Sequence, residues 1–374
     1  MGRFSISRPR SLRVVAATAL VFLRFALPAF AAAGDLDLAF GIGGKVTTDF
    51  SPKQDIANGV AIQTNGKIVV GGASGGGAKF ALARYNTDGS LDTTFSGDGK
   101  LTTDFTRHED LAHAVAIQDN GKIVAAGTAA ADRSNSRFAL ARYNSDGSLD
   151  TTFSGNGMLT TDFTPGADLV FYGLAIQSDG RLVVAGVAGG KFALARYDTN
   201  GSLDTSFSGD GKVTTNFTRY GDPAFGVAIQ ADGKIVAAGE AGFGYPSGEF
   251  ALARYGAEGS LDPTFGGDGK VTTAFTQLED GASLPAIQAD GKIVAAGGAA
   301  FESSNPRFAL ARYNTDGSLD PTFSTNGKVV TNFTPNADYA DGLAIQANGR
   351  IIAAGVAGEG GSNPKVALAR YLAA

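Results

Sequence analysis

A pentapeptide, Ala-Leu-Ala-Arg-Tyr, recurs six times at nearly even spacing, and this repetition constrains the fold more than any other feature of the chain. Successive copies begin 58, 54, 58, 58 and 58 residues apart. Two further motifs recur with it: one ends in Ala-Ile-Gln, and the other reads Lys-Val-Thr-Thr-Asp-Phe or a close variant. Repetition at a fixed period is typical of solenoids, propellers and repeat arrays.

Each repeat contains four short apolar segments that we expect to form antiparallel β-strands. They read GVAIQ, KIVVGG or KIVAAG, FALARY, and KVTTDF. Asn-Gly or Asp-Gly joins the first two, and these dipeptides suit two-residue hairpins because both central residues adopt positive φ. The third segment leaves through stretches such as NTDGSLD. The segments are almost continuously apolar, which is expected of sheets covered on both faces. Each repeat therefore predicts one four-stranded meander, or blade.

The two ends of the chain carry complementary halves of one repeat. The last copy stops at Tyr371, after its third segment, whereas residues 36–50 hold the Leu-Asp-x-x-Phe and Lys-Val-Thr-Thr-Asp-Phe motifs that follow the third segment elsewhere. We therefore predict that the N-terminal strand completes the last blade, which removes the open sheet edges. The predicted fold is all-β: a six-bladed β-propeller with four antiparallel strands per blade, in a single domain over residues 34–374 built from six repeats of about 58 residues.

The combination of LDxxFxxxG, TTDF, VAIQxDGKIVAAG and FALARYNxDGSLD motifs resembles the bacterial delta-60 repeat family. The resemblance extends over nearly all of residues 35–372. It implies a β-propeller domain of unassigned molecular function, often found in exported or surface proteins. The resemblance implies no catalytic residues.

The first 33 residues have the pattern of a secretory signal peptide. Four arginines and no acidic residue precede the apolar run Val14–Leu23, and two small-x-small cleavage sites follow within residues 29–33. The run is too short for an ordinary membrane span. We expect cleavage of residues 1–33, with a retained N-terminal anchor as the alternative. The mature protein is then expected in the periplasm, outside the cell or on its surface, without a membrane span.

Composition excludes several classes of function. The chain has no cysteine, which rules out disulfides, thiolate metal sites and cysteine nucleophiles. The five arginines before residue 34 leave the rest of the chain with 26 basic and 36 acidic residues, a balance that argues against nucleic-acid binding. The sequence has two histidines and none of the P-loop, Gly-x-Ser-x-Gly or His-Glu-x-x-His motifs.

We therefore expect a monomeric, non-enzymatic binding or surface-interaction module whose partner is a protein, a glycan or a component of the cell envelope. The alternatives are a metal-assisted hydrolase or lactonase-like enzyme and a purely structural envelope protein. The connection between the second and third strands varies in length and sequence between repeats, whereas the other spacings are nearly constant. Loops on a rigid scaffold usually carry binding specificity, so the face with these connections is the first place to expect a ligand.

One aspartate precedes the first strand of every repeat on that same face. Six carboxylates near the mouth of a central channel could hold a cation or another ligand, whereas the simpler interpretation is that each caps its own turn by accepting backbone N–H bonds. These candidate ligand-binding residues are Asp55, Asp110, Asp168, Asp222, Asp280 and Asp338.

One arginine and one aspartate per repeat suggest a structural ion pair, because a buried arginine needs such a partner. The arginines are Arg84, Arg142, Arg196, Arg254, Arg312 and Arg370. The aspartates are Asp37, Asp92, Asp150, Asp204, Asp262 and Asp320. The Asn-x-Asp-Gly-x-x-Asp segments also permit a calcium site, although a hairpin turn explains the same pattern. No metal ligand set and no other cofactor is predicted.

Overall fold

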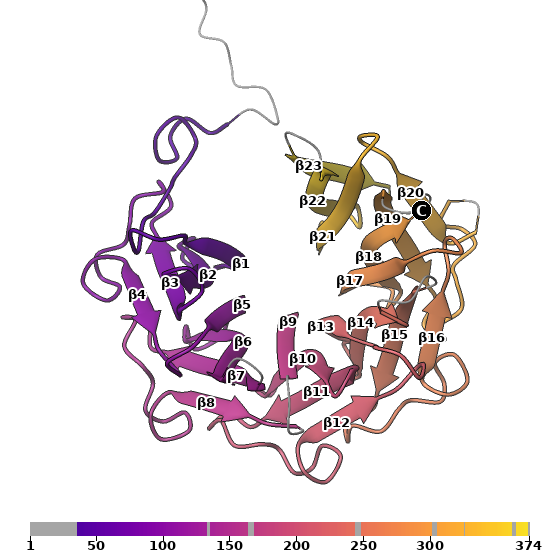
Figure 1. Cartoon of the computed structure of the whole chain (residues 1–374), viewed down its shortest axis with the longest axis horizontal. Helices are drawn as coiled ribbons and strands as arrows, with labels where there is room; N and C mark the ends of the chain where they lie inside the picture. The colour runs from indigo at the N-terminus through magenta and orange to yellow at the C-terminus, as the bar shows by residue number, and fades with distance from the viewer. Residues whose placement is uncertain are drawn as a thin grey trace, which may run out of the picture.

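The computed structural model describes residues 36–132, 135–163, 168–243, 248–300, 305–324, 326–360 and 364–372. These residues form 23 β-strands in six sheets set around a common centre (Figure 1). The predicted all-β, six-bladed propeller is therefore confirmed. The predicted signal peptide, residues 1–33, lies outside the described residues. In the part of the chain that is described, there is no helix long and apolar enough to cross a membrane.

Each sheet is an antiparallel meander that follows the order of the chain, with its first strand nearest the centre. Blade 1 contains β1 (Ile56–Ile62), β2 (Ile68–Ser74), β3 (Lys79–Tyr85) and β4 (Lys100–Thr103). Blade 2 contains β5 (Asp110–Ile117), β6 (Ile123–Asp132), β7 (Asn135–Tyr143) and β8 (Met158–Thr161). Blade 3 contains β9 (Asp168–Ile176), β10 (Leu182–Ala188), β11 (Lys191–Tyr197) and β12 (Lys212–Thr215).

The second half of the ring continues this pattern. Blade 4 contains β13 (Ala224–Ile229), β14 (Ile235–Ala241), β15 (Glu249–Tyr255) and β16 (Lys270–Thr273). Blade 5 contains β17 (Asp280–Ile287), β18 (Ile293–Ala300), β19 (Pro306–Tyr313) and β20 (Lys328–Thr331). Blade 6 contains β21 (Ala337–Ile345), β22 (Ile351–Glu359) and β23 (Lys365–Tyr371).

Large apolar side chains of one blade pack on alanines of the next, which explains why a β-protein tolerates so many alanines. Between blades 1 and 2, Phe80 and Leu82 of β3 share one core cluster with Ala139 and Ala141 of β7. Successive residues of a strand point to opposite faces, so FALARY presents Phe and Leu to one neighbour and Ala to the other. The same arrangement recurs in the core clusters between the following blades.

A β-bulge interrupts the innermost strand of every blade. In blade 2, Ala112 pairs with Gly127 and Ala114 pairs with Ala126, so His113 is the extra residue. Gly127 is needed here because a Cβ atom at that position would lie 1.9 Å from the carbonyl oxygen of Leu111. The glycine that ends each KIVAAG-type motif thus allows the bulge.

A threonine–tyrosine hydrogen bond crosses every blade boundary. The hydroxyl groups lie 2.6–2.8 Å apart. The pairs are Thr48–Tyr85, Thr103–Tyr143, Thr161–Tyr197, Thr215–Tyr255, Thr273–Tyr313 and Thr331–Tyr371. The first pair shows that the segment before β1 lies against blade 1 as the outer part of a preceding blade would. Gly41 N–H also donates to Asp88 O, just as Ser96 N–H donates to Asp146 O one repeat later.

The predicted closure of the ring is not formed in the described residues. Blade 6 has three strands, and residues 45–50 do not pair with β23 (Figure 1). Val366 and Leu368 of β23 are 91% and 63% exposed, whereas Phe80 and Leu82, their counterparts in β3, are fully buried. The contacts of residues 36–50 with blade 1 join residues near in sequence, whereas pairing with β23 must close a loop as long as the domain, at a greater entropic cost.

Candidate functional site

The six repeated aspartates are bound by their own blades. The carboxylate of Asp222 accepts hydrogen bonds from Phe217 N–H, from Thr218 N–H and hydroxyl, and from Gly242 N–H, at 2.8–3.0 Å. Five of the six side chains have no exposed area, and Asp55 is partly exposed. Burial raises the pKa of Asp110 and Asp280, whereas the Phe50 N–H bond lowers the pKa of Asp55. These contacts are those of a turn cap.

The repeated arginines and aspartates lie at the opposite end of the strands. In five blades the arginine Nε is 2.6–2.8 Å from the aspartate Oδ2, with both side chains almost fully buried. The pairs are Arg84–Asp92, Arg142–Asp150, Arg196–Asp204, Arg254–Asp262 and Arg312–Asp320. The sixth predicted pair is not formed: Arg370 and Asp37 are both exposed, because the blade that would unite them is not closed.

Four of these ion pairs, those of Arg84, Arg142, Arg196 and Arg254, also join two blades through a bond from the arginine to a backbone carbonyl of the next blade. Arg84 donates to the carbonyl of Ser145 in blade 2, and its guanidinium lies 4.7 Å from the ring centroid of Phe95. Burial raises the pKa of Asp92, but hydrogen bonds from Lys67, Thr94 and Arg84 together lower it below its usual value. The charge is thus satisfied by several donors, as a buried carboxylate requires.

The Asn-x-Asp-Gly-x-x-Asp segments have other partners for their carboxylates. Asp88 accepts bonds from the backbone and hydroxyl of Ser90, and Asp92 accepts those of Arg84 and Lys67. Among the described residues, no group of three His, Cys, Asp or Glu side chains is placed to hold a metal ion. A hairpin turn accounts for the pattern in these contacts, and a calcium site here stays a prediction.

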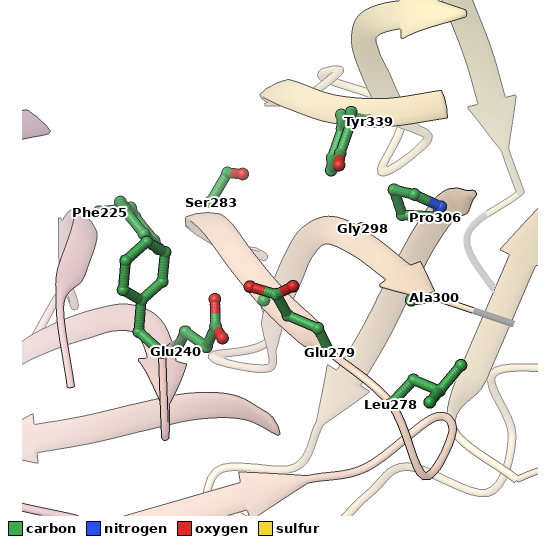
Figure 2. A pocket seen from close by; sticks show the side chains of 11 residues that line it. Phe225, Glu240, Leu278, Glu279, Ser283, Gly298, Ala300, Pro306 and Tyr339 are labelled. Carbon is green, nitrogen blue, oxygen red and sulfur yellow. The ribbon is translucent and has the colours of Figure 1, made fainter. Parts of the chain in front are cut away.

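A cavity of about 480 Å³ lies on the face that the sequence predicts to be variable, where blades 4, 5 and 6 meet. Figure 2 shows the carboxyl groups of Glu240 and Glu279 directed into the same space, with Phe225 on one side and Tyr339 on the other. The lining residues come from β13, β14, β17, β18, β19 and β21 and from the connections before β17 and after β14. Phe243, in the connection between β14 and β15, also borders this cavity.

Three glycines make room for the side chains of Glu240 and Tyr339. A Cβ atom would lie 2.2 Å from Glu240 Oε1 at Gly248 and 2.7 Å from Glu240 Oε2 at Gly281. At Gly298 it would lie 2.8 Å from Cδ1 of Tyr339. The equivalents of Gly281 in other blades are Ile56, Leu111, Leu169, Pro223 and Tyr339. The cavity thus exists because blade 5 lacks side chains that the other blades carry.

Glu240 is an acidic residue at a position where the other repeats carry small or aliphatic uncharged residues. Its equivalents are Ala73, Thr128, Val187, Gly298 and Val356. The side chain is 4% exposed, and Oε1 has no hydrogen-bond partner in the described part of the chain. Burial raises the pKa of Glu240 to about 8, and the negative charges of Glu279 and Asp280 contribute to this shift. Perturbed carboxyl groups in cavities are concentrated at functional sites.

The bulged residues of the innermost strands differ from blade to blade and supply further walls. Phe225 and Ser283 are the bulged residues of β13 and β17, and both line the cavity. Phe225 also packs edge-to-face against Phe243, with ring centroids 6.5 Å apart. The corresponding residues elsewhere are Asn58, His113 and Asp341. The bulge is a constant of the scaffold, whereas the side chain it presents is not.

Sequence reasoning predicted a ligand on this face of the ring but did not single out the residues that line the cavity. The features that the repeats share lead to Asp222 and its equivalents. The carboxylate of Asp222 accepts hydrogen bonds from the connection before β13 and from Gly242 after β14. The more useful signal is a difference between repeats: Glu240 and Gly281 differ from the residues at the equivalent positions of the other repeats. Recognising that these two positions meet requires the ring, because they lie on different sheets.

Fold and site together define a β-propeller repeat protein in which a repetitive scaffold carries a cavity between blades 4, 5 and 6. The β-propeller domain of unknown function DUF5122 matches five segments, at residues 63–95, 118–153, 177–207, 230–265 and 288–323. Five of the six repeats thus match this family of β-propeller repeat proteins, in agreement with the resemblance of the chain to delta-60 repeats. No curated protein sequence matches the chain.

Solved structures share the architecture at low sequence identity. A catalytically inactive virginiamycin B lyase from Staphylococcus aureus is 11% identical, with a TM-score of 0.52 over 87% of this chain and 86% of that one. A gluconolactonase from Xanthomonas campestris is 11% identical, with a TM-score of 0.44 over 80% and 83%. Hydrazine synthase from Kuenenia stuttgartiensis is 14% identical, with a TM-score of 0.46 over 83% and 80%. At such identity the likeness concerns the fold alone.

Proposed function

We propose that this protein is an exported, non-enzymatic binding module and that the cavity between blades 4, 5 and 6 holds a small ligand. The carrying observation is Glu240, a buried carboxyl group whose Oε1 atom has no hydrogen-bond partner among the described residues, in a cavity that the repeat pattern would otherwise fill. A buried polar atom without a partner costs free energy, so its retention is best explained by a bound group that satisfies it. The basic and apolar stretches before residue 34 support export.

The size and lining of the cavity suit this role. Its volume of about 480 Å³ falls within the range of small-molecule sites. Aromatic and apolar walls with a few polar groups are the usual composition of such sites. Phe225, Phe243 and Tyr339 provide the walls, and Glu240, Glu279 and Ser283 provide the polar groups.

The experiment is a ligand-observed NMR screen with a small fragment library that contains cationic, neutral and anionic members. Wild-type protein is compared with Gly281→Leu, which fills the cavity with the side chain that blades 2 and 3 carry at this position. Ile56→Leu, a change at the equivalent position of blade 1, is the matched control. We expect fragments that bind the wild type and the control but not Gly281→Leu. If every fragment binds all three proteins equally, the cavity is not the ligand site.

A further inference from the structure

We infer that the ligand of this cavity is an organic cation, with an alkylated ammonium group held between Glu240, Glu279 and the aromatic walls. The inference rests on the proposed function, because it specifies the ligand class of the same site. It is carried by three features of the cavity: the sign of its charge, the unpartnered oxygen of Glu240, and the aromatic rings around it.

The charge in and around the cavity is of one sign. Of the lining residues in the described part of the chain, two are glutamates and none is a lysine, arginine or histidine. The carboxylates of Glu279 and Asp280 act on Glu240, and those of Glu359, Glu279, Asp341 and Glu240 all act on Tyr339. Low-dielectric walls lined by one sign of charge concentrate ligands of the opposite sign. An anionic ligand would have to overcome this field, whereas a cation is drawn into it.

The buried carboxyl group of Glu240 favours a positively charged partner. Its side chain enters the cavity from β14 and is enclosed by Gly248 and Gly281, so it has little freedom to turn towards solvent. Oε1 accepts no hydrogen bond from the described residues. A ligand cation next to this oxygen supplies the missing electrostatic partner, and charge-assisted contacts of this kind are among the stronger polar interactions.

The rings indicate an organic cation in preference to a metal ion. Aromatic faces attract cations that come within about 6 Å of the ring centroid, and quaternary ammonium groups are recognised in this way. Phe225 lies on one side of Glu240 and Tyr339 on the other (Figure 2), and Phe225 packs edge-to-face against Phe243. Calcium prefers about six to eight oxygen ligands, whereas only two carboxylates line this space.

The test uses choline and its uncharged analogue in which carbon replaces the ammonium nitrogen, with binding followed by NMR titration at about pH 9, above the titration of Glu240. The proteins are the wild type, Glu240→Gln, Gly281→Leu and the control Ile56→Leu. Gln keeps the shape of the side chain and removes its charge. We expect choline to bind the wild type and Ile56→Leu at least about tenfold more tightly than the uncharged analogue. Glu240→Gln should lose at least about tenfold in choline affinity, and Gly281→Leu should not bind choline detectably.

Equal affinity for choline and the analogue, unchanged choline affinity in Glu240→Gln, or no binding of choline to the wild type would each overturn the inference. These results are distinct from a failure of the proposed function. If neutral fragments bind the wild type and are blocked by Gly281→Leu while choline is not bound, the cavity is a ligand site of another class. Thermal unfolding of all four proteins shows whether each variant is folded.

Discussion

The two ends of the strands differ in how closely the blades resemble one another. At the Arg–Asp end, five blades repeat the same ion pair with Nε–Oδ2 distances that agree within 0.2 Å. At the cavity end, the residue after the KIVAAG-type glycine changes from Ala73 to Thr128 and Glu240. The comparison teaches that repetition in this protein marks what holds the blades together, and departure from repetition marks where one blade acquires its own chemistry.

Breaking the Arg–Asp end should have the largest effect. Arg254→Ala removes one of the two basic partners of the buried Asp262, the other being Lys234, and also removes the bond from Arg254 to Thr315 O in the next blade. We expect a loss of about 3–5 kcal/mol in the free energy of unfolding, measured by chemical denaturation. Lys79→Ala removes an exposed ion pair to Asp104 and should cost less than about 1 kcal/mol. Similar losses in both variants would mean that the buried pairs are not structural.

At the cavity end, removing a charged group should stabilise the protein near neutral and alkaline pH. The pKa of Glu240 is raised to about 8 in the folded protein, so the folded state keeps a proton that the unfolded chain releases near pH 4.5. The free energy of unfolding should therefore fall as pH rises from about 4.5 to about 8. Glu240→Gln should remove this dependence and gain about 4–5 kcal/mol at pH 8.5, with no gain at pH 4. Denaturation of both proteins across this range is the measurement, and parallel curves would contradict the assignment.

The repeated aspartates are the exception at the cavity end, since they are as uniform as the ion pairs. Asp222→Asn keeps an acceptor for part of the turn and loses the charge that receives four hydrogen bonds. We expect a loss of about 1–2 kcal/mol as the cap weakens. Thermal unfolding with EDTA and then with millimolar calcium tests the competing role. A calcium-dependent rise in Tm that Asp222→Asn abolishes would make the aspartates a cation site.

The smallest expected losses in the free energy of unfolding come from removing one Thr–Tyr hydrogen bond, either between two blades or beside the opening of the ring. Tyr143→Phe leaves the buried Thr103 hydroxyl without a partner and should cost about 1 kcal/mol. Tyr85→Phe removes the equivalent bond to Thr48 at a partly exposed boundary and should cost less. Equal losses in urea unfolding would indicate that the segment before β1 is as firmly seated on blade 1 as one blade is on the next.

Much of the fold follows from the sequence because identical hairpins, apolar strands and turns recur and reinforce one another. The position of the ion pairs could be predicted for the same reason, since Arg84 and Asp92 keep a constant separation in every complete repeat. Glu240 could not be assigned in this way, because its significance depends on Gly281 and Gly248 from other strands. Ring closure was predicted from complementary motifs, but motif complementarity does not include the entropy of uniting distant ends.

The three glycines around Glu240 and Tyr339 have a consequence for how such a protein can evolve. Nearly identical repeats can be duplicated, deleted or exchanged, and such changes preserve the Arg–Asp end because blades 1 to 5 all carry the same ion pair. The cavity does not, because Glu240, Gly281 and Tyr339 must stand on three successive blades in that order. Exchanging blade 5 for a copy of blade 2 would leave a complete scaffold with a leucine where the ligand space was. The order of the blades therefore determines whether the cavity exists, whereas the propeller fold does not depend on that order.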